Sequence, residues 1–399
     1  MKKTLAAVAV LGAFAGSALA ADVTLYGVVD LGFGYAHSDA KNNLPSNSED
    51  FIDQRSDKFE MKSGQNSGSR IGFKGTEQLS DDVTVGFVLE TGFNADTGVN
   101  EDAFFHRESR LFVQTAFGEI GLGRYGALDS TTGPYDLGGD IHATTGVAGV
   151  GSTSAIFLGQ NGRHNNAITY KSPNFGGLTV LAQFASGTDD KGDQDYSSDS
   201  DRYYALGASY DVGALHSALV VSRTEYNPTT VTLLSEDKDT TRPIDDSTVV
   251  TAGVSYDFGV TKTFVAGQYY KNVIYTSMSK TNFGSIKDPV WKKDFTGAVK
   301  GYGVTLGADT PVFGGTLTTQ VGYSDAETVE NFRAEGVRDA SYEAWNVGAI
   351  YEYPLSKRTS LYGAVGYQQK QEKADLVDER DYSYKEKSIN AGFGMVHTF

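Results

Sequence analysis

The segment Ser388-Ile-Asn-Ala-Gly-Phe-Gly-Met-Val-His-Thr-Phe399 alternates between apolar side chains and small or polar ones up to the last residue. In a strand with a two-residue period, Ile389, Phe393, Met395 and Phe399 fall on one face. The other face carries Ser, Asn, Gly and Thr side chains. We expect such a strand to be paired along both edges, and a closed barrel provides that pairing. The segment therefore favours an all-β barrel.

The same alternation returns at several other places in the chain. Apolar residues occupy every second position in 22–36, 83–90, 178–184, 301–306 and 360–368. Strict alternation predicts strands with one apolar face. The composition agrees, because 23 Tyr, 22 Phe and 47 Gly suit strands joined by tight turns.

The connections between these strands separate a membrane barrel from a soluble sandwich. Short and long connections alternate. The seven short ones are near Leu79–Asp82, Ala116–Gly118, Pro173–Gly177, Asp211–Gly213, Asp257–Gly259, Asp309–Gly315 and Tyr353–Lys357. The eight long polar ones are near 37–66, 94–103, 127–162, 187–201, 226–247, 272–296, 325–340 and 370–384. This order predicts a 16-stranded antiparallel transmembrane β-barrel, wide enough for a water channel, with short turns on one rim and long loops on the other.

Charge and composition exclude several other classes. The net charge of −16 argues against nucleic acid as a partner, and a chain without cysteine has no disulfides or cysteine metal sites. Lys2 and Lys3 precede an apolar stretch that ends in Ala18-Leu19-Ala20. We therefore expect residues 1–20 to be a signal peptide for export and residues 21–399 to form one barrel domain. The six histidines show no spacing that suggests a metal site or a catalytic triad.

Six motifs follow one another along the chain. They are Asp22-Val-Thr-Leu-Tyr-Gly-Val-Val-Asp30, Gly68-Ser-Arg-Ile-Gly-Phe-Lys-Gly75, Phe117-Gly118 with Gly121-Leu-Gly-Arg124, Pro134-Tyr-Asp-Leu-Gly-Gly-Asp140, Asn165-Asn-Ala-Ile-Thr-Tyr170 with Ser172-Pro173, and Gly394-Met-Val-His-Thr-Phe399. In this order the chain resembles the general diffusion porins of Gram-negative bacteria, in the branch typical of beta-proteobacteria. The resemblance covers essentially all of residues 1–399.

The resemblance implies a homotrimer in the outer membrane, in which each subunit has its own pore for small hydrophilic solutes and ions. It implies that the third external loop, 127–162, folds inward and narrows the channel. Such a channel needs no cofactor and is not an enzyme. The resemblance also implies contact with outer-membrane lipid and lipopolysaccharide. It further implies recognition of the C-terminal strand by the barrel-assembly machinery, with Phe399 as the assembly signal.

In the family, wall arginines face carboxylates on the inward loop, and solutes pass between them. The resemblance assigns Arg70, Arg107 and Arg163 to the wall, and Asp136 and Asp140 to the loop. Alternation supports the first assignment independently. Arg70 and Lys74 share a face with a glycine while Ile71 and Phe73 take the other face, so both cations are predicted to point into the lumen.

Arg107 conflicts with the alternation rule. If Arg107 faces the lumen, Glu108 and Arg110 face outward, where an arginine near the middle of the bilayer costs about 2–4 kcal/mol. We therefore expect the first strands to lie at the trimer interface, where Glu108 and Arg110 can pair away from lipid.

The residues leave other functions open. The closest alternative is a substrate-selective channel for a sugar, a phosphate or a dicarboxylate. A barrel enzyme would need a catalytic group, and none is visible in the sequence. A surface adhesin would use the long acidic loops. The acidic loops attract cations while the arginines favour anions, so the sequence does not decide the ion selectivity.

Overall fold

The structure is a computed structural model of the 399-residue chain. It describes residues 23–43, 46, 51–100, 103–187, 200–226, 230–234, 239–243, 245–275, 297–329, 337–376 and 381–399. The expected signal peptide, residues 1–20, lies outside the described residues. Among the described residues, no helix is long and apolar enough to cross a membrane.

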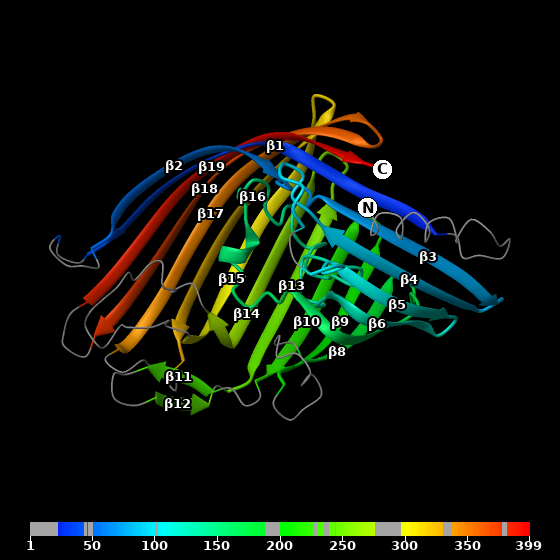
Figure 1. Ribbon diagram of the computed structural model, residues 1–399, viewed down its shortest axis with the longest axis horizontal. Helices are drawn as coiled ribbons and strands as arrows, with labels where there is room; N and C mark the ends of the chain where they lie inside the picture. The colour runs from blue at the N-terminus through cyan, green and yellow to red at the C-terminus, as the bar shows by residue number, and fades with distance from the viewer. Residues whose placement is uncertain are drawn as a thin grey trace, which may run out of the picture.

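The fold is a closed antiparallel barrel of sixteen wall strands (Figure 1). The wall strands are β1 (Thr24–Asn42), β2 (Asp53–Ser63) with β3 (Arg70–Ser80), β4 (Val83–Gly92), β5 (Glu108–Thr115), β6 (Gly118–Gly126), β7 (Arg163–Lys171), β8 (Leu178–Ser186), β9 (Arg202–Val212), β10 (Leu215–Glu225), β13 (Ser247–Asp257), β14 (Lys262–Tyr275), β15 (Gly297–Val312), β16 (Gly315–Thr328), β17 (Val337–Ser356), β18 (Thr359–Leu376) and β19 (Asp381–Thr398). β11 (Thr230–Leu234) and β12 (Asp239–Pro243) form a separate hairpin.

β2 and β3 count as one wall strand because they pair in succession with the same edge of β1. Residues 31–41 of β1 pair with β2, and residues 24–28 of β1 pair with β3. Residues 64–69 lie between the two halves and interrupt the strand. The predicted number of sixteen strands is confirmed.

The barrel closes where the first strand meets the last. β1 pairs with β19 from Val28 opposite Thr398 to Asn42 opposite Tyr384. One residue beyond the Val28–Thr398 end of this ladder, Gly27 and Phe399 form two backbone hydrogen bonds with each other, both 3.1 Å long. The first and last described strands of the barrel therefore lie side by side. The terminal strand is paired on both edges, as its sequence predicted.

The alternation of short turns and longer loops is also confirmed, but two of the predicted loops are mostly strand. In the predicted loop 370–384, β18 continues to Leu376 and β19 begins at Asp381. The segment 37–66, predicted as a loop, is mostly a hairpin, because β1 continues to Asn42 and β2 begins at Asp53. Beyond the Tyr35–Phe59 pair, polar residues line both faces of this hairpin, and His37 opposite Asp57 is one such pair. Outside the lipid both faces of a strand are wet, so the apolar alternation disappears while the backbone ladder continues.

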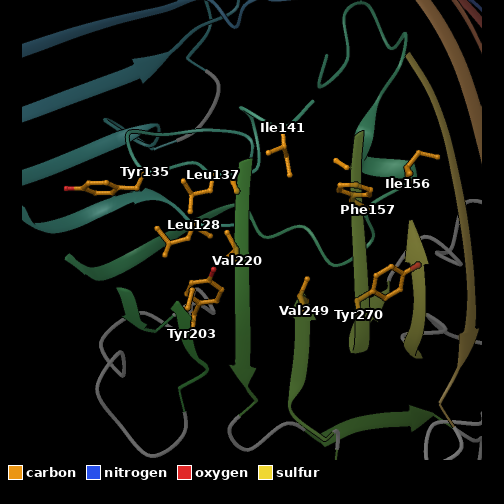
Figure 2. Packing of buried hydrophobic residues seen from close by; sticks show 14 of the residues in the cluster. Leu128, Tyr135, Leu137, Ile141, Ile156, Phe157, Tyr203, Val220, Val249 and Tyr270 are labelled. Carbon is orange, nitrogen blue, oxygen red and sulfur yellow. The ribbon is translucent and has the colours of Figure 1, made fainter. Parts of the chain in front are cut away.

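Apolar side chains point outward and the lumen holds small and polar ones. The outer surface carries exposed apolar residues on successive strands, including Phe33, Leu111, Ile120, Leu206, Val265, Leu306, Val365 and Phe393. The main buried cluster lies inside the barrel, where loop 127–162 packs on the wall. Figure 2 shows Leu128, Ile141 and Phe157 of the loop beside Val220 and Val249 of the wall.

The closure predicts that Gly27 tolerates no side chain. A Cβ atom at Gly27 would lie 2.4 Å from the Phe399 ring and 2.7 Å from the Arg70 carbonyl oxygen. We expect Gly27→Ala to lower the free energy of unfolding by about 1–3 kcal/mol, the usual cost of overpacking. The matched control is Gly363→Ala, because nothing lies within 4 Å of that Cβ position. The stability of each variant is measured as the temperature at which half of the folded barrel changes its mobility on SDS gels. Equal midpoint temperatures for Gly27→Ala and Gly363→Ala would contradict the prediction.

Candidate functional site

Loop 127–162 leaves the wall after β6, crosses the lumen and returns at β7, and polar wall residues hold it along its length. Near its start, buried Asp129 accepts hydrogen bonds from Ser222 of β10 (2.5 Å) and Tyr203 of β9 (3.0 Å). Four side-chain amides of the wall form hydrogen bonds with backbone groups of the loop, namely those of Gln183, Gln268, Gln320 and Asn346. The loop is therefore a fixed part of the lumen, folded inward as the family resemblance implied.

Three of the predicted arginines gather around one carboxylate at the inner wall. Glu90 of β4 accepts a hydrogen bond from Arg107 Nε at 2.7 Å and from the Tyr26 hydroxyl at 2.9 Å. Arg70 Nε lies 3.6 Å from the same carboxylate. Arg163 Nε donates to the backbone carbonyl of Arg107 at 2.7 Å. We call Arg70, Arg107 and Arg163 the arginine group.

Arg70 and Lys74 take the orientation that alternation predicted. β1 pairs with β3 so that Tyr26 lies opposite Gly72 and Thr24 opposite Lys74, all on the lumen face. The Lys74 ammonium lies 5.2 Å from the centre of the Tyr26 ring. Arg163 lies at the first position of β7, and its guanidinium reaches the Arg107 backbone.

The prediction that Glu108 and Arg110 face outward is wrong. β4 pairs with β5 so that Glu108 lies opposite Glu90 and Arg110 opposite Val88, which places both on the lumen face. Arg110 binds Glu108 at 2.8 Å, Glu119 at 2.9 Å and the hydroxyl of the loop residue Tyr135 at 2.7 Å. Arg107 precedes β5, which begins at Glu108, so the alternation of the strand does not apply to it. The expected trimer-interface pairing is not needed to explain these charges.

Asp136 and Asp140 lie apart from the arginine group. They line a cavity of about 460 Å³ between the loop and the wall, together with Lys171, Lys262 and His216. No ion pair of the described residues joins either loop carboxylate to the arginine group. Burial, and then the nearby charge of Asp140, raise the pKa of Asp136 to about 7. The loop carboxylates therefore face wall lysines across the cavity.

Sequence reasoning missed Glu90 and Glu119, and it placed Glu108 and Arg110 on the wrong face of their strand. A signal for Glu90 was present, because it falls on the same face of the 83–90 alternation as Thr84 and Gly86. With the arginine group, these residues give four guanidiniums and three carboxylates along β3 to β7. Among the described residues, no group of three or more His, Asp or Glu side chains could hold a metal ion. A site of this composition acts on a passing solute through its width and its electric field.

Comparison with known proteins identifies the family. A family model described as Gram-negative porin matches residues 6–373. The chain belongs to the Gram-negative porins. This porin is 29% identical to outer membrane porin protein 32 of Delftia acidovorans, over 92% of this chain and 89% of that protein. It is 28% identical to an outer membrane porin protein of Bordetella pertussis over the full length of both.

Solved structures agree with this assignment. An anion-selective porin from Comamonas acidovorans superimposes with a TM-score of 0.61 and 25% identity, over 95% of this chain and all of the other. The trimer form of OmpT from Vibrio cholerae shares the fold, with a TM-score of 0.57 and 15% identity. This porin is thus an outer-membrane protein that forms a water-filled channel for passive diffusion of small hydrophilic solutes. The predicted general channel is confirmed, and the substrate-selective alternative is not favoured.

The raised pKa of Asp136 predicts a pH-dependent channel. Below its pKa of about 7 the carboxyl group is neutral, so acidification removes one negative charge from the lumen. We expect the reversal potential in a salt gradient to move toward anions as the pH falls from about 9 to about 5. Asp136→Asn should abolish the part of the change centred near neutral pH. Asp140→Asn removes the neighbouring charge and should move the pH-dependent change in reversal potential to lower pH. An identical pH profile in the wild-type protein and both variants would contradict the raised pKa of Asp136.

Proposed function

We propose that the arginine group, Lys74, Asp136 and Asp140 form the constriction of this channel, and that the narrow part favours anions. The observation that carries this proposal is the arrangement of the arginine group around a single glutamate. Glu90 supplies one negative charge against the three positive charges of the arginine group. The remaining positive charge acts on ions in the lumen.

The other charges near the constriction offset one another more closely. Arg110 binds two carboxylates, Glu108 and Glu119, both within 2.9 Å, which leaves one excess negative charge there. Taken with the arginine group and Glu90, four guanidiniums still outnumber three carboxylates. Asp136 is partly protonated near neutral pH, which reduces the negative charge of the loop. The related Comamonas porin is anion-selective, which supports the same sign for this channel.

We propose that this porin is a homotrimer, as the trimer form of the OmpT neighbour is. β2 forms a ladder with β1, and no ladder joins its other edge to another described strand. An unpaired edge is a site for association unless something covers it. Phe59 and Met61 of β2 are 66% and 50% exposed, and the Phe59 ring stacks on Phe33. A neighbouring subunit against β1 and β2 would cover this edge and its apolar side chains.

We propose that residues 1–20 direct export and that the barrel-assembly machinery reads the C-terminal strand, with Phe399 as its signal. The strand presents Ile389, Phe393 and Met395 outward, each at least 44% exposed, as a lipid-facing strand requires. The acidic external loops give lipopolysaccharide a surface to which divalent cations can link it.

Recordings of the purified protein in planar bilayers test the channel and its subunit number. We expect stepwise openings, in groups of three equal steps for a homotrimer. Arg70→Ala should shift the reversal potential toward cations. The permeability ratio should change by up to about fivefold, since two unit charges about 4 Å apart in water interact by about 1 kcal/mol.

The matched control for Arg70→Ala is Arg223→Ala. Arg223 is 56% exposed and lies on the outer face of β10, between the outward-facing Val221 and the strand end. The substitution Arg223→Ala removes one positive charge outside the lumen and should leave the reversal potential unchanged. A silent protein would refute the channel, and an unchanged reversal potential in Arg70→Ala would refute the constriction.

Deleting Phe399 tests the assembly signal in intact cells. We expect the shortened chain to accumulate in the periplasm and to be degraded, because β19 then lacks the residue that closes on Gly27 and is read during assembly. Refolding of the same variant in lipid vesicles separates the two roles. Normal assembly in cells would contradict the signal, whereas failure in both systems assigns Phe399 to barrel closure alone.

A further inference from the structure

A short segment inside the barrel connects the arginine group to the tip of loop 127–162, which we call the constriction loop. Residues 64–69 interrupt the second wall strand between β2 and β3, and we call them the inner strap. The strap turns inward at Gly64, whose φ of +68° lies in the left-handed region that glycine adopts readily. Ser69, at its end, is fully buried and returns the chain to β3.

Asp30 of β1 anchors the inner strap. Its carboxylate is fully buried and accepts hydrogen bonds from the backbone amides of Asn66 (2.6 Å) and Ser67 (2.8 Å). The hydroxyl of Tyr362 donates to the other oxygen at 2.8 Å and itself accepts a hydrogen bond from the Gln65 side chain. Buried polar groups are costly when they lose a partner. Asp30 and Tyr362 therefore hold the strap in one position.

The inner strap holds two members of the arginine group. Arg70 Nη1 donates to the Gly68 carbonyl at 3.0 Å and to Ser67 Oγ at 3.3 Å. The Arg107 guanidinium packs on Gly68, where an added Cβ would lie 3.1 Å from Nη1. These contacts keep Arg70 Nε at 3.6 Å from Glu90, outside direct hydrogen-bond distance. Arg70 and Glu90 thus form an ion pair that is longer than a hydrogen bond, and a released Arg70 could close on Glu90 and expose less of its charge to the lumen.

The inner strap also receives the tip of the constriction loop. The Ala148 amide donates to the Gln65 carbonyl at 2.9 Å. Ala148 and Gly149 have φ values of +50° and +80° between Val147 and Val150, which bond to each other across the turn. A left-handed alanine costs about 1–2 kcal/mol, so this turn is kept by its surroundings.

Three wall glycines make room for this tip. A Cβ atom at Gly348, Gly366 or Gly392 would lie within 2.7 Å of Val150 or Ala148. The tip therefore fits between these three positions of β17, β18 and β19 on one side and the strap on the other. We call the three glycines the glycine seat.

We propose that Asp30 is a positioning residue for ion selectivity: through the inner strap it fixes the Arg70 and Arg107 guanidiniums and the tip of the constriction loop. This inference rests on the proposed role of the arginine group in the constriction. Asp30 itself is fully buried and does not contact the solute. Its effect on permeation passes through the strap.

The test compares the reversal potential and open-channel noise of Asp30→Asn and Tyr362→Phe with the wild-type channel in planar bilayers. Removing the Asp30 charge would by itself move the potential toward anions. We expect the opposite, a shift toward cations, because a released Arg70 closes its ion pair with Glu90 and exposes less charge to the lumen. Tyr362→Phe changes no charge and should shift the potential in the same direction, by about half of the Arg70→Ala shift or more. Both variants should be noisier because the loop tip is freed.

The matched control is Tyr342→Phe, which removes another buried tyrosine hydroxyl that bonds to the loop, at the Ala155 carbonyl (2.9 Å), away from the strap. It should leave the reversal potential unchanged. The inference is overturned if Arg70→Ala shifts the potential while Tyr362→Phe behaves like Tyr342→Phe, or if Asp30→Asn shifts it toward anions. No shift in Arg70→Ala itself would instead refute the proposed constriction. Because Tyr362→Phe keeps the charge and shape of the core, it answers the question even if Asp30→Asn does not fold.

Discussion

The structure depends on one constraint: in a bilayer, each backbone amide and carbonyl group must find its partner within the protein. A sheet satisfies this only if its first and last strands meet, and here the junction is the ladder between β1 and β19 with the Gly27–Phe399 pair at its end. The close fit of the Phe399 ring over Gly27 follows from the same closure. Because the backbone is satisfied within the wall, side chains are free to divide between an apolar outside and a polar lumen.

Buried polar anchors organise the lumen together with the apolar cluster between loop 127–162 and the wall. Asp129 fixes the start of the constriction loop to β9 and β10, and Asp30 fixes the strap on which the tip of the loop rests. Between these two carboxylates the loop packs its apolar side chains on the inner wall. The guanidiniums of Arg70 and Arg107 are therefore positioned through the strap by a carboxylate that is itself buried.

Most of the fold could be predicted from the sequence, because alternation and the order of turns are local properties. The orientation of Arg70 and Lys74 followed from the same rule. The rule was wrong for Glu108 and Arg110 because it assumed that Arg107 belongs to the strand, whereas β5 begins one residue later. The inner strap could not be foreseen, since its anchor joins Asp30 to Tyr362, residues 332 positions apart in the chain. The separation of Asp136 and Asp140 from the arginine group likewise depends on how the loop folds across the lumen.

The glycine seat has an evolutionary consequence. Its three positions belong to three different strands, and each one accommodates the loop tip by lacking a single carbon atom. A glycine codon becomes an alanine codon by one base change, and the added methyl group would displace the tip toward the barrel axis while the ladder of the wall remains intact. The bore of the channel can thus be adjusted in small heritable steps, without any change in the number or pairing of the strands.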